Sequence, residues 1–208
     1  MKRRWIAALW AVGLAALLAG CDETRLQTDH ALLAPVDASG PQLRPGLWRI
    51  EDSGCEVRES NPVGDWPNCV RWLVVKPGVL ATMEKEADGP VWTSKDYVLA
   101  GQGVQAMQIT DGDGIGLYGV RALRTGEDGQ ATRIRRWEIS CGPLRTTGEK
   151  DEDGRPKQAV AAWSGVVMTG QERCRPDGVS GLMAAAAASE TGEKSPDIVM
   201  HWVRESAS

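Results

Sequence analysis

Two neighbouring segments joined by a glycine-rich turn most constrain the fold of this chain. Residues 105–110 alternate apolar and polar side chains, and residues 115–124 continue with Tyr118 and Val120 on one side. Between them, residues 111–114 read Asp-Gly-Asp-Gly, which is a strong signal for a tight turn between antiparallel strands. The pattern predicts a β-hairpin with one face turned toward an apolar core.

The same rhythm of short segments separated by turn residues runs through most of the chain. Trp48 and Ile50 share one face of a segment, and Trp137, Ile139 and Cys141 share one face of another. Alternation with a period of two is typical of half-buried strands. The expected strands cover residues 47–51, 70–75, 79–85, 97–99, 105–110, 115–124, 131–141, 159–168 and 198–205.

Two segments depart from this rhythm. Residues 149–156 are strongly polar, and we expect them to form an exposed loop. Residues 180–190 are rich in alanine, with Ser180 as an N-cap and Gly192 beyond the end, so they predict one short helix. We therefore expect a mainly β fold, an antiparallel barrel or sandwich of about eight strands with one short helix near the C-terminus. Residues 45–208 suffice to form it as a single β-rich domain.

The N-terminus has the features of an export signal. Three basic residues at positions 2–4 precede an apolar stretch at residues 5–19. As a helix this stretch would be about 22 Å long, which is too short to cross a hydrocarbon core of about 30 Å. It is typical of a signal peptide and not of a permanent membrane span.

The sequence Leu18-Ala19-Gly20-Cys21 resembles the lipobox of bacterial lipoproteins, in which a leucine and two small residues precede the cysteine. The resemblance covers only the leader. It implies removal of residues 1–20 and attachment of lipid to Cys21, and several acyl chains make a stable membrane anchor where one does not. The alternatives are an ordinary secretory signal that happens to precede a cysteine, or an uncleaved N-terminal helix.

We expect residues 21–44 to form the lipidated cysteine and a flexible tether, because they lack periodicity and carry Pro35 and Pro41. The implied location is the cell envelope, facing the periplasm, with the membrane and an envelope protein as expected partners. Asp22 and Glu23 resemble the signal that retains lipoproteins in the inner membrane of enterobacteria. Other bacteria read this position differently, so both membranes remain open.

Charge argues against one class of partner. The chain has 24 basic and 28 acidic residues, and residues 1–20 hold three basic and no acidic ones, so the mature chain has a net charge of 21 − 28 = −7. Nucleic acids require a positive field, and we expect no nucleic-acid partner. The basic run Arg133, Arg135 and Arg136 is interpreted as the polar face of a strand.

Four cysteines besides Cys21 predict disulfides, because the leader directs the chain to an oxidising compartment. Of the three possible pairings we favour Cys55 with Cys69 and Cys141 with Cys174, since each joins neighbouring segments. The competing interpretation is a zinc site. No two of these cysteines have the two-to-four-residue spacing of a zinc knuckle and the chain has only two histidines, so we expect no metal.

The sequence presents no catalytic constellation. His201 stands in an expected strand, and a Ser-His-Asp triad would have to use it, since the other histidine lies in the expected tether. Ser180 is followed two residues later by Leu182 and not by the glycine of a nucleophile elbow. Residues 111–114 open like a calcium loop, but the aspartate-rich run is too short. We expect no catalytic residue, no cofactor and no enzyme activity.

The tryptophans are expected to pack in the core and not to form a ligand-stacking surface. The mature part has seven, at Trp48, Trp66, Trp72, Trp92, Trp137, Trp163 and Trp202. The expected function is a structural or protein-interaction role of a membrane-anchored envelope lipoprotein. A lipocalin-like carrier of a small apolar ligand is the main alternative, and an undetected hydrolase is the third.

Overall fold

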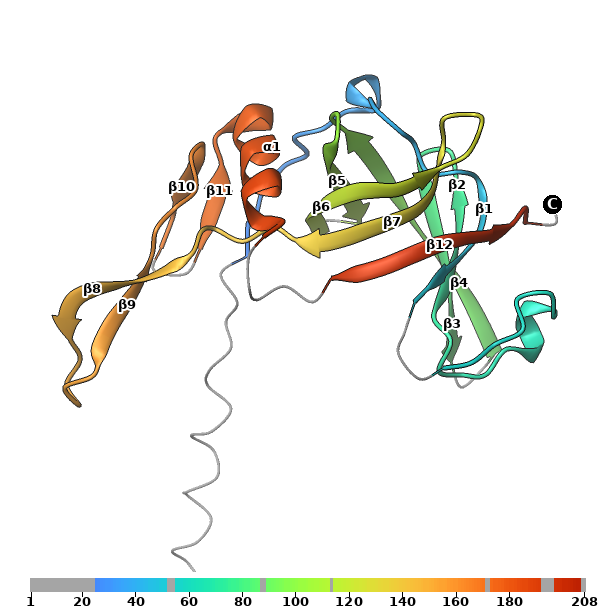
Figure 1. Ribbon diagram of the computed structural model, residues 1–208, viewed down its shortest axis with the longest axis horizontal. Helices are drawn as coiled ribbons and strands as arrows, with labels where there is room; N and C mark the ends of the chain where they lie inside the picture. Colours follow the sequence, from blue (N-terminus) through green and yellow to red (C-terminus); the bar gives the residue numbers. More distant parts are fainter. Residues whose placement is uncertain are drawn as a thin grey trace, which may run out of the picture.

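The computed structural model of the chain describes residues 25–51, 55–86, 89–112, 114–170, 173–191 and 197–206. Eight antiparallel strands form a closed barrel, as Figure 1 shows. They are β1 (Gly46–Ile50), β2 (Trp72–Lys76), β3 (Val79–Glu86), β4 (Gly89–Ala100), β5 (Val104–Asp111), β6 (Gly114–Thr125), β7 (Ala131–Glu138) and β12 (Ile198–Arg204). Their order around the barrel is β1-β12-β7-β6-β5-β4-β3-β2, so consecutive strands are neighbours except where β12 closes the barrel.

An insertion between β7 and β12 holds the other elements. Its members are β8 (Leu144–Lys150), β9 (Pro156–Val160), β10 (Val166–Met168), β11 (Cys174–Pro176) and α1 (Gly178–Ser189). β8 pairs with β9, and β10 pairs with β11, as two separate two-stranded sheets. In Figure 1 the β8–β9 ribbon projects to one side, and α1 lies between β10–β11 and the barrel.

The interior of the barrel is filled by side chains. Alternate residues of the strands meet in one buried cluster, in which Trp48, Leu99 and Ile134 have no accessible surface. An eight-stranded barrel is just wide enough for its inward side chains to fill it. The rest of the cluster is Leu43, Leu73, Val75, Leu80, Tyr97, Met107, Val120, Ala131 and Met200.

A second cluster lies outside the barrel, between its wall and α1. Leu182, Ala185 and Ala186 recur at helical spacing and form the buried face of α1 against β5 and β6. Trp137 lies flat against Gly119 of β6, where a Cβ would come within 2.2 Å of the indole ring. The indole nitrogen of Trp137 donates a hydrogen bond of 3.0 Å to the carbonyl of Ala186, which fastens the helix to the barrel wall.

Residues 25–44 are packed against the barrel, which differs from the flexible tether that we expected. Leu26, Leu33 and Leu43 are all buried. The backbone of this segment is hydrogen-bonded to distant strands, for example from Arg44 N to Ala131 O at 3.0 Å. The segment crosses the barrel wall as irregular chain with one short 3-10 turn, η2 (Pro35–Asp37), so its buried leucines have no regular spacing. Residues 21–24 lie outside the described residues.

Most expected strands are present, and the insertion differs from expectation in two details. Residues 149–156 are exposed as expected, but Glu149 and Lys150 belong to β8 and Pro156 belongs to β9, so the loop itself covers residues 151–155. The single strand expected at residues 159–168 is divided between β9 and β10, which belong to different sheets. The hairpin at residues 105–124 and the helix near the C-terminus are confirmed, although α1 begins at Gly178 and not at Ser180.

Both expected disulfides are present. Cys55–Cys69 closes a loop that covers the outer face of β1 and β2 and includes a second 3-10 turn, η3 (Val63–Asp65). Cys141–Cys174 joins the end of β7 to the start of β11, and both half-cystines are buried. Of the helices in the described ranges, none has the length and hydropathy needed to span a bilayer.

Candidate functional site

The residues singled out in the sequence lie in separate places. Cys21, the expected lipidation site, is outside the described residues. His201 lies on the outer side of β12, while the inward-facing Met200 belongs to the barrel core. The turn at residues 111–114 joins β5 to β6, as expected.

Both ring nitrogens of His201 face carboxylates. Nδ1 lies 3.1 Å from Oε1 of Glu51, and Nε2 lies 2.7 Å from Oε1 of Glu59. Glu51 also accepts two hydrogen bonds of 2.8 Å from Arg133, and Glu59 accepts one of 3.0 Å from Arg49. The five side chains form one continuous hydrogen-bonded network over the outer faces of β1, β7 and β12, in which both ring nitrogens of His201 already have partners.

The arginines set the charge state of this network. Hydrogen bonds from Arg133 hold the pKa of the Glu51 carboxyl below its usual value, against the opposing effect of burial. Burial acts to raise the pKa of Glu59, but hydrogen bonds from His201 and Arg49 outweigh it, and the pKa is lowered. Both carboxylates are therefore anionic at neutral pH and serve as fixed acceptors.

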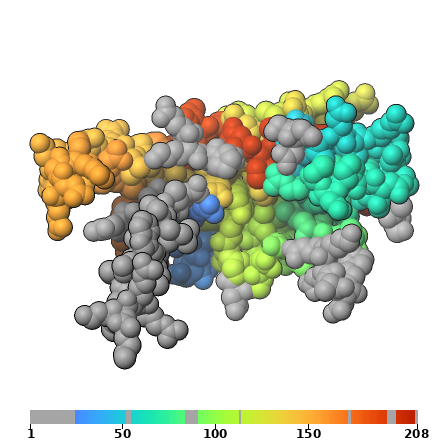
Figure 2. All heavy atoms as spheres, turned by 90° about the horizontal axis from the view of Figure 1, so that it is seen from below, coloured from blue at the N-terminus to red at the C-terminus, as the bar shows by residue number. Residues whose placement is uncertain are grey.

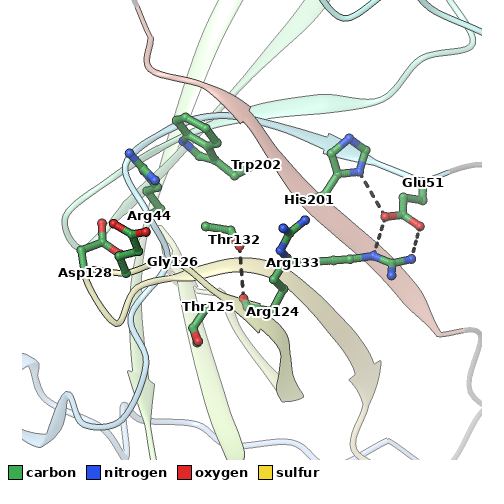
Figure 3. Close-up of a pocket in the computed structure, with 11 residues that line it drawn as sticks. Arg44, Glu51, Arg124, Thr125, Gly126, Asp128, Thr132, Arg133, His201 and Trp202 are labelled. Carbon is green, nitrogen blue, oxygen red and sulfur yellow. Dashed lines mark hydrogen bonds and ion pairs between the residues drawn. The ribbon is translucent and has the colours of Figure 1, made fainter.

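An open groove of about 860 Å³ begins beside this network and runs to the turn between β6 and β7 (Figure 3). Arg44 lies over the indole of Trp202, with its Cζ 4.2 Å from the ring centroid, on the side of the turn. The groove is lined by Arg44, Glu51, Arg124, Thr125, Gly126, Glu127, Asp128, Thr132, Arg133, His201 and Trp202.

The lining of the groove combines charged, hydroxyl-bearing and aromatic side chains. Arg124 is exposed and forms no ion pair within the described part of the chain, whereas Arg133 is held by Glu51. Glu127 and Asp128 place negative charge on the opposite rim. Cations, anions, hydroxyl groups and the indole of Trp202 therefore line one open surface. This groove could not be predicted from the sequence, because three segments that are distant along the chain meet in it.

The basic run of β7 is divided between the two sides of the barrel. Arg133 and Arg135 point outward to Glu51 and Glu190, as a polar strand face requires. Arg136 instead points inward and stacks on Tyr118, with its Cζ 4.5 Å from the ring centroid. Burial lowers the pKa of the Arg136 guanidinium from its ordinary value. The expectation of one shared polar face was thus wrong for Arg136.

The tryptophans mostly pack as expected. Trp48, Trp66 and Trp137 are buried, and Trp72, Trp163 and Trp202 are half-buried. Trp92 is the exception, since 56% of it is exposed on β4.

The β8–β9 hairpin, which we call the arm, projects from the body of the molecule. Every residue of β8 is exposed, and so are four of the five residues of β9. In Figure 2 the orange part of the chain, which includes the arm, forms one end of the elongated molecule. At its base the backbone ladder continues from Ala161 N to Pro143 O at 2.9 Å, next to the Cys141–Cys174 disulfide.

Within the described residues, no group of three or more His, Cys, Asp or Glu side chains is arranged to hold a metal ion. Comparison of the chain with protein-family models, with curated protein sequences and with solved structures finds no match.

Proposed function

We propose that the chain is the precursor of a bacterial envelope lipoprotein, anchored by lipid on Cys21, whose domain acts through contacts with another envelope protein. The lipobox at residues 18–21 supports the anchor. Two disulfides agree with an oxidising periplasm. The role through contacts rests on the surface of the domain.

The observation that carries this proposal is the arm. A segment whose side chains are nearly all exposed adds little to the apolar core. An isolated two-stranded hairpin is marginally stable in water, yet this one is fixed at its base by the buried Cys141–Cys174 disulfide. Its outer strand edges present unpaired backbone groups, which another chain can extend by strand addition. A rigid projecting ribbon of this kind contributes little to the stability of the fold and is well suited to bind another protein.

The arm can be tested by excision. Because Ala161 N donates to Pro143 O, an Asn-Gly turn can replace residues 144–160 and leave the base closed. We expect this variant to keep both disulfides and nearly all of its thermal stability. A photo-crosslinking residue at Thr146 in the arm should capture a discrete envelope protein in living cells, whereas the same residue at the exposed Lys76 of β2 should not.

Two results would contradict this proposal. One is the same pattern of adducts from Thr146 and Lys76. The other is full complementation of a deletion strain by the armless variant. The anchor is tested separately. Cys21→Ser should abolish labelling by a fatty-acid probe and release the protein into the soluble periplasmic fraction. Labelling that persists in this variant would contradict the lipobox assignment.

The alternative is a carrier of a small apolar ligand, which the eight-stranded barrel by itself would suit. A carrier needs interior volume, but here Trp48, Leu99 and Met107 pack in the centre of the barrel with at most 1% of their surface accessible. We therefore expect no saturable change in tryptophan fluorescence on titration with fatty acids. A saturable change would favour the carrier.

A further inference from the structure

Exposed apolar side chains gather on the hairpin formed by β3 and β4. Trp92 and Met83 are exposed to 56% and 38%. Met83 stands directly opposite Trp92 in the strand register, and Trp92 packs edge-on against Trp72 of β2, with ring centroids 5.7 Å apart. We call Trp72, Met83 and Trp92 the hairpin patch, because the regular register places these three side chains on one face of the strands. An exposed apolar cluster of this kind marks a contact surface.

The hairpin patch lies toward the end of the barrel at which the described chain begins. In the antiparallel barrel, β3 and β7 run in the same direction, so the turn from β3 to β4 and the last residue of β7, Glu138, are at the same end. Arg25 lies beside that end of β7, because it forms a bridge with Ser140 and an ion pair of 2.9 Å with Glu138.

The chain outside the structure is too short to hold this end far from a lipid anchor. Three residues lie between Cys21 and Arg25, so four residue-to-residue steps at 3.3–3.6 Å each reach about 14 Å at most. The next residue, Leu26, is buried, and its N–H donates to Ile139 O at 2.9 Å. A lipid on Cys21 therefore brings the end of the barrel next to the bilayer surface.

We propose that the hairpin patch rests on the interface of the phospholipid bilayer that holds the Cys21 lipid, as a second contact with the membrane. This inference rests on the lipid anchor of the proposed function. Tryptophan favours the membrane–water interface, because its ring is apolar and its N–H is polar. Met83 adds apolar surface beside it.

The contact is apolar and not electrostatic. The sequence at the hairpin turn carries Glu84, Lys85, Glu86 and Asp88, a net charge of −2, and the mature chain is acidic as a whole. Anionic lipids attract basic segments and not acidic ones. The hairpin patch should therefore contact zwitterionic bilayers at least as well as anionic ones, and high salt should not release it.

The test uses the full lipidated protein in phosphatidylcholine vesicles that contain a lipid brominated near the headgroup, which quenches tryptophan at the interface. Wild-type fluorescence should be quenched, and Trp92→Ser should lose most of the quenchable part. The matched control adds Val36→Trp to Trp92→Ser, which restores the number of tryptophans. Val36 is 89% exposed in η2, and Ser39 N bonds to Leu99 O near the opposite end of the barrel, so this tryptophan should not be quenched.

The outcomes separate the patch from the anchor. Probe labelling and flotation with vesicles, without bromine-dependent quenching, would overturn the patch and leave the lipid anchor intact. Absence of both labelling and flotation would overturn the anchor, and the patch with it. Self-association on vesicles that Trp92→Ser abolishes, again without bromine quenching, would assign the patch to a second copy of the chain and overturn the bilayer contact.

Discussion

Gln108 offers the sharpest test of how the N-terminal segment is held. It lies on the outer face of β5, with 3% of its surface accessible. Its Oε1 accepts hydrogen bonds of 2.7 Å from Leu32 N and 3.0 Å from Leu33 N, and its Nε2 donates one of 3.0 Å to Leu33 O. One side chain thus satisfies three backbone groups of a segment 75 residues away.

Gln108→Ala removes all three bonds and leaves the buried N–H and C=O of Leu33 without these partners. A typical hydrogen bond contributes about 1 kcal/mol, and a buried group left unsatisfied costs about 1–3 kcal/mol. Since the segment can partly relax and admit water, we expect the free energy of unfolding to fall by about 2–4 kcal/mol. Gln158→Ala is the control, because Gln158 is exposed on the arm and the change should stay within about 0.5 kcal/mol.

The assay is urea unfolding of the soluble Cys21→Ser form, combined with hydrogen exchange. In Gln108→Ala, the amides of Leu32 and Leu33 should exchange faster than in the parent, while the barrel amides should lose only the protection that matches the global change. A loss below about 0.5 kcal/mol with unchanged exchange at these two amides would show that Gln108 does not hold the segment, and would restore the free tether as an explanation.

Two further predictions concern the insertion. Replacing Cys141 and Cys174 by Ala should lower the free energy of unfolding by about 4 kcal/mol in the chain-entropy model, since the bridge spans 33 residues; a loss below about 1 kcal/mol in chemical denaturation would contradict that model here. Hydrogen bonds from Arg121, one of them 2.6 Å long, and from Arg135 hold the pKa of Glu190 below its usual value. The ionised Glu190 carboxylate therefore stabilises the fold at pH values above the pKa that this carboxyl has in the unfolded chain. This stabilisation is lost as the pH falls through its lower pKa in the folded protein. The loss in the free energy of unfolding caused by Glu190→Gln should therefore vanish at low pH. A loss that does not depend on pH would refute the stabilising role of the ionised Glu190 carboxylate.

The barrel was predictable because its strands have one buried face. Trp48 and Ile50, or Tyr118 and Val120, recur with a period of two, and the structure places each pair on the inner side. The same rule missed the first half of β4. Only its end, with Tyr97 and Leu99, is apolar on the inner side, whereas Thr93 hydrogen-bonds across to Thr82 of β3 at 2.9 Å. Polar cross-strand pairs leave no hydrophobic period in a sequence.

The arm could not be predicted for a related reason. Both faces of β8 are exposed, so its seven residues show no alternation of apolar and polar side chains. In the sequence they resemble a solvated loop. What makes it a hairpin is the ladder to β9, which begins at the pair Leu144 and Val160. Pairing across a sixteen-residue separation is tertiary information, and propensity alone cannot supply it.

The candidate groove was equally hidden. Arg44 comes from the N-terminal segment, Arg124 from β6 and Trp202 from β12, so neither spacing nor composition connects them. The four cysteines were different, because an even number in an exported chain already restricts the pairing. Covalent partners are few enough to be counted in a sequence, whereas the non-covalent neighbours of a surface arginine are not.

The N-terminal segment, which packs on the barrel, relates the two surfaces proposed for contact, the arm and the hairpin patch. Leu26 forms a bridge with Cys174, and Gln27 N donates to Cys174 O at 2.9 Å, so the chain that comes from the anchor is hydrogen-bonded directly beside the disulfide at the base of the arm. A free tether would let the domain tumble above the bilayer and average every direction of the arm. A segment held by backbone bonds and buried leucines instead fixes the direction of the arm relative to the anchor. If Cys21 carries the proposed lipid, the constraint that brings the hairpin patch to the lipid surface also limits where the arm can reach, and the proposed partner must present its binding edge within that reach.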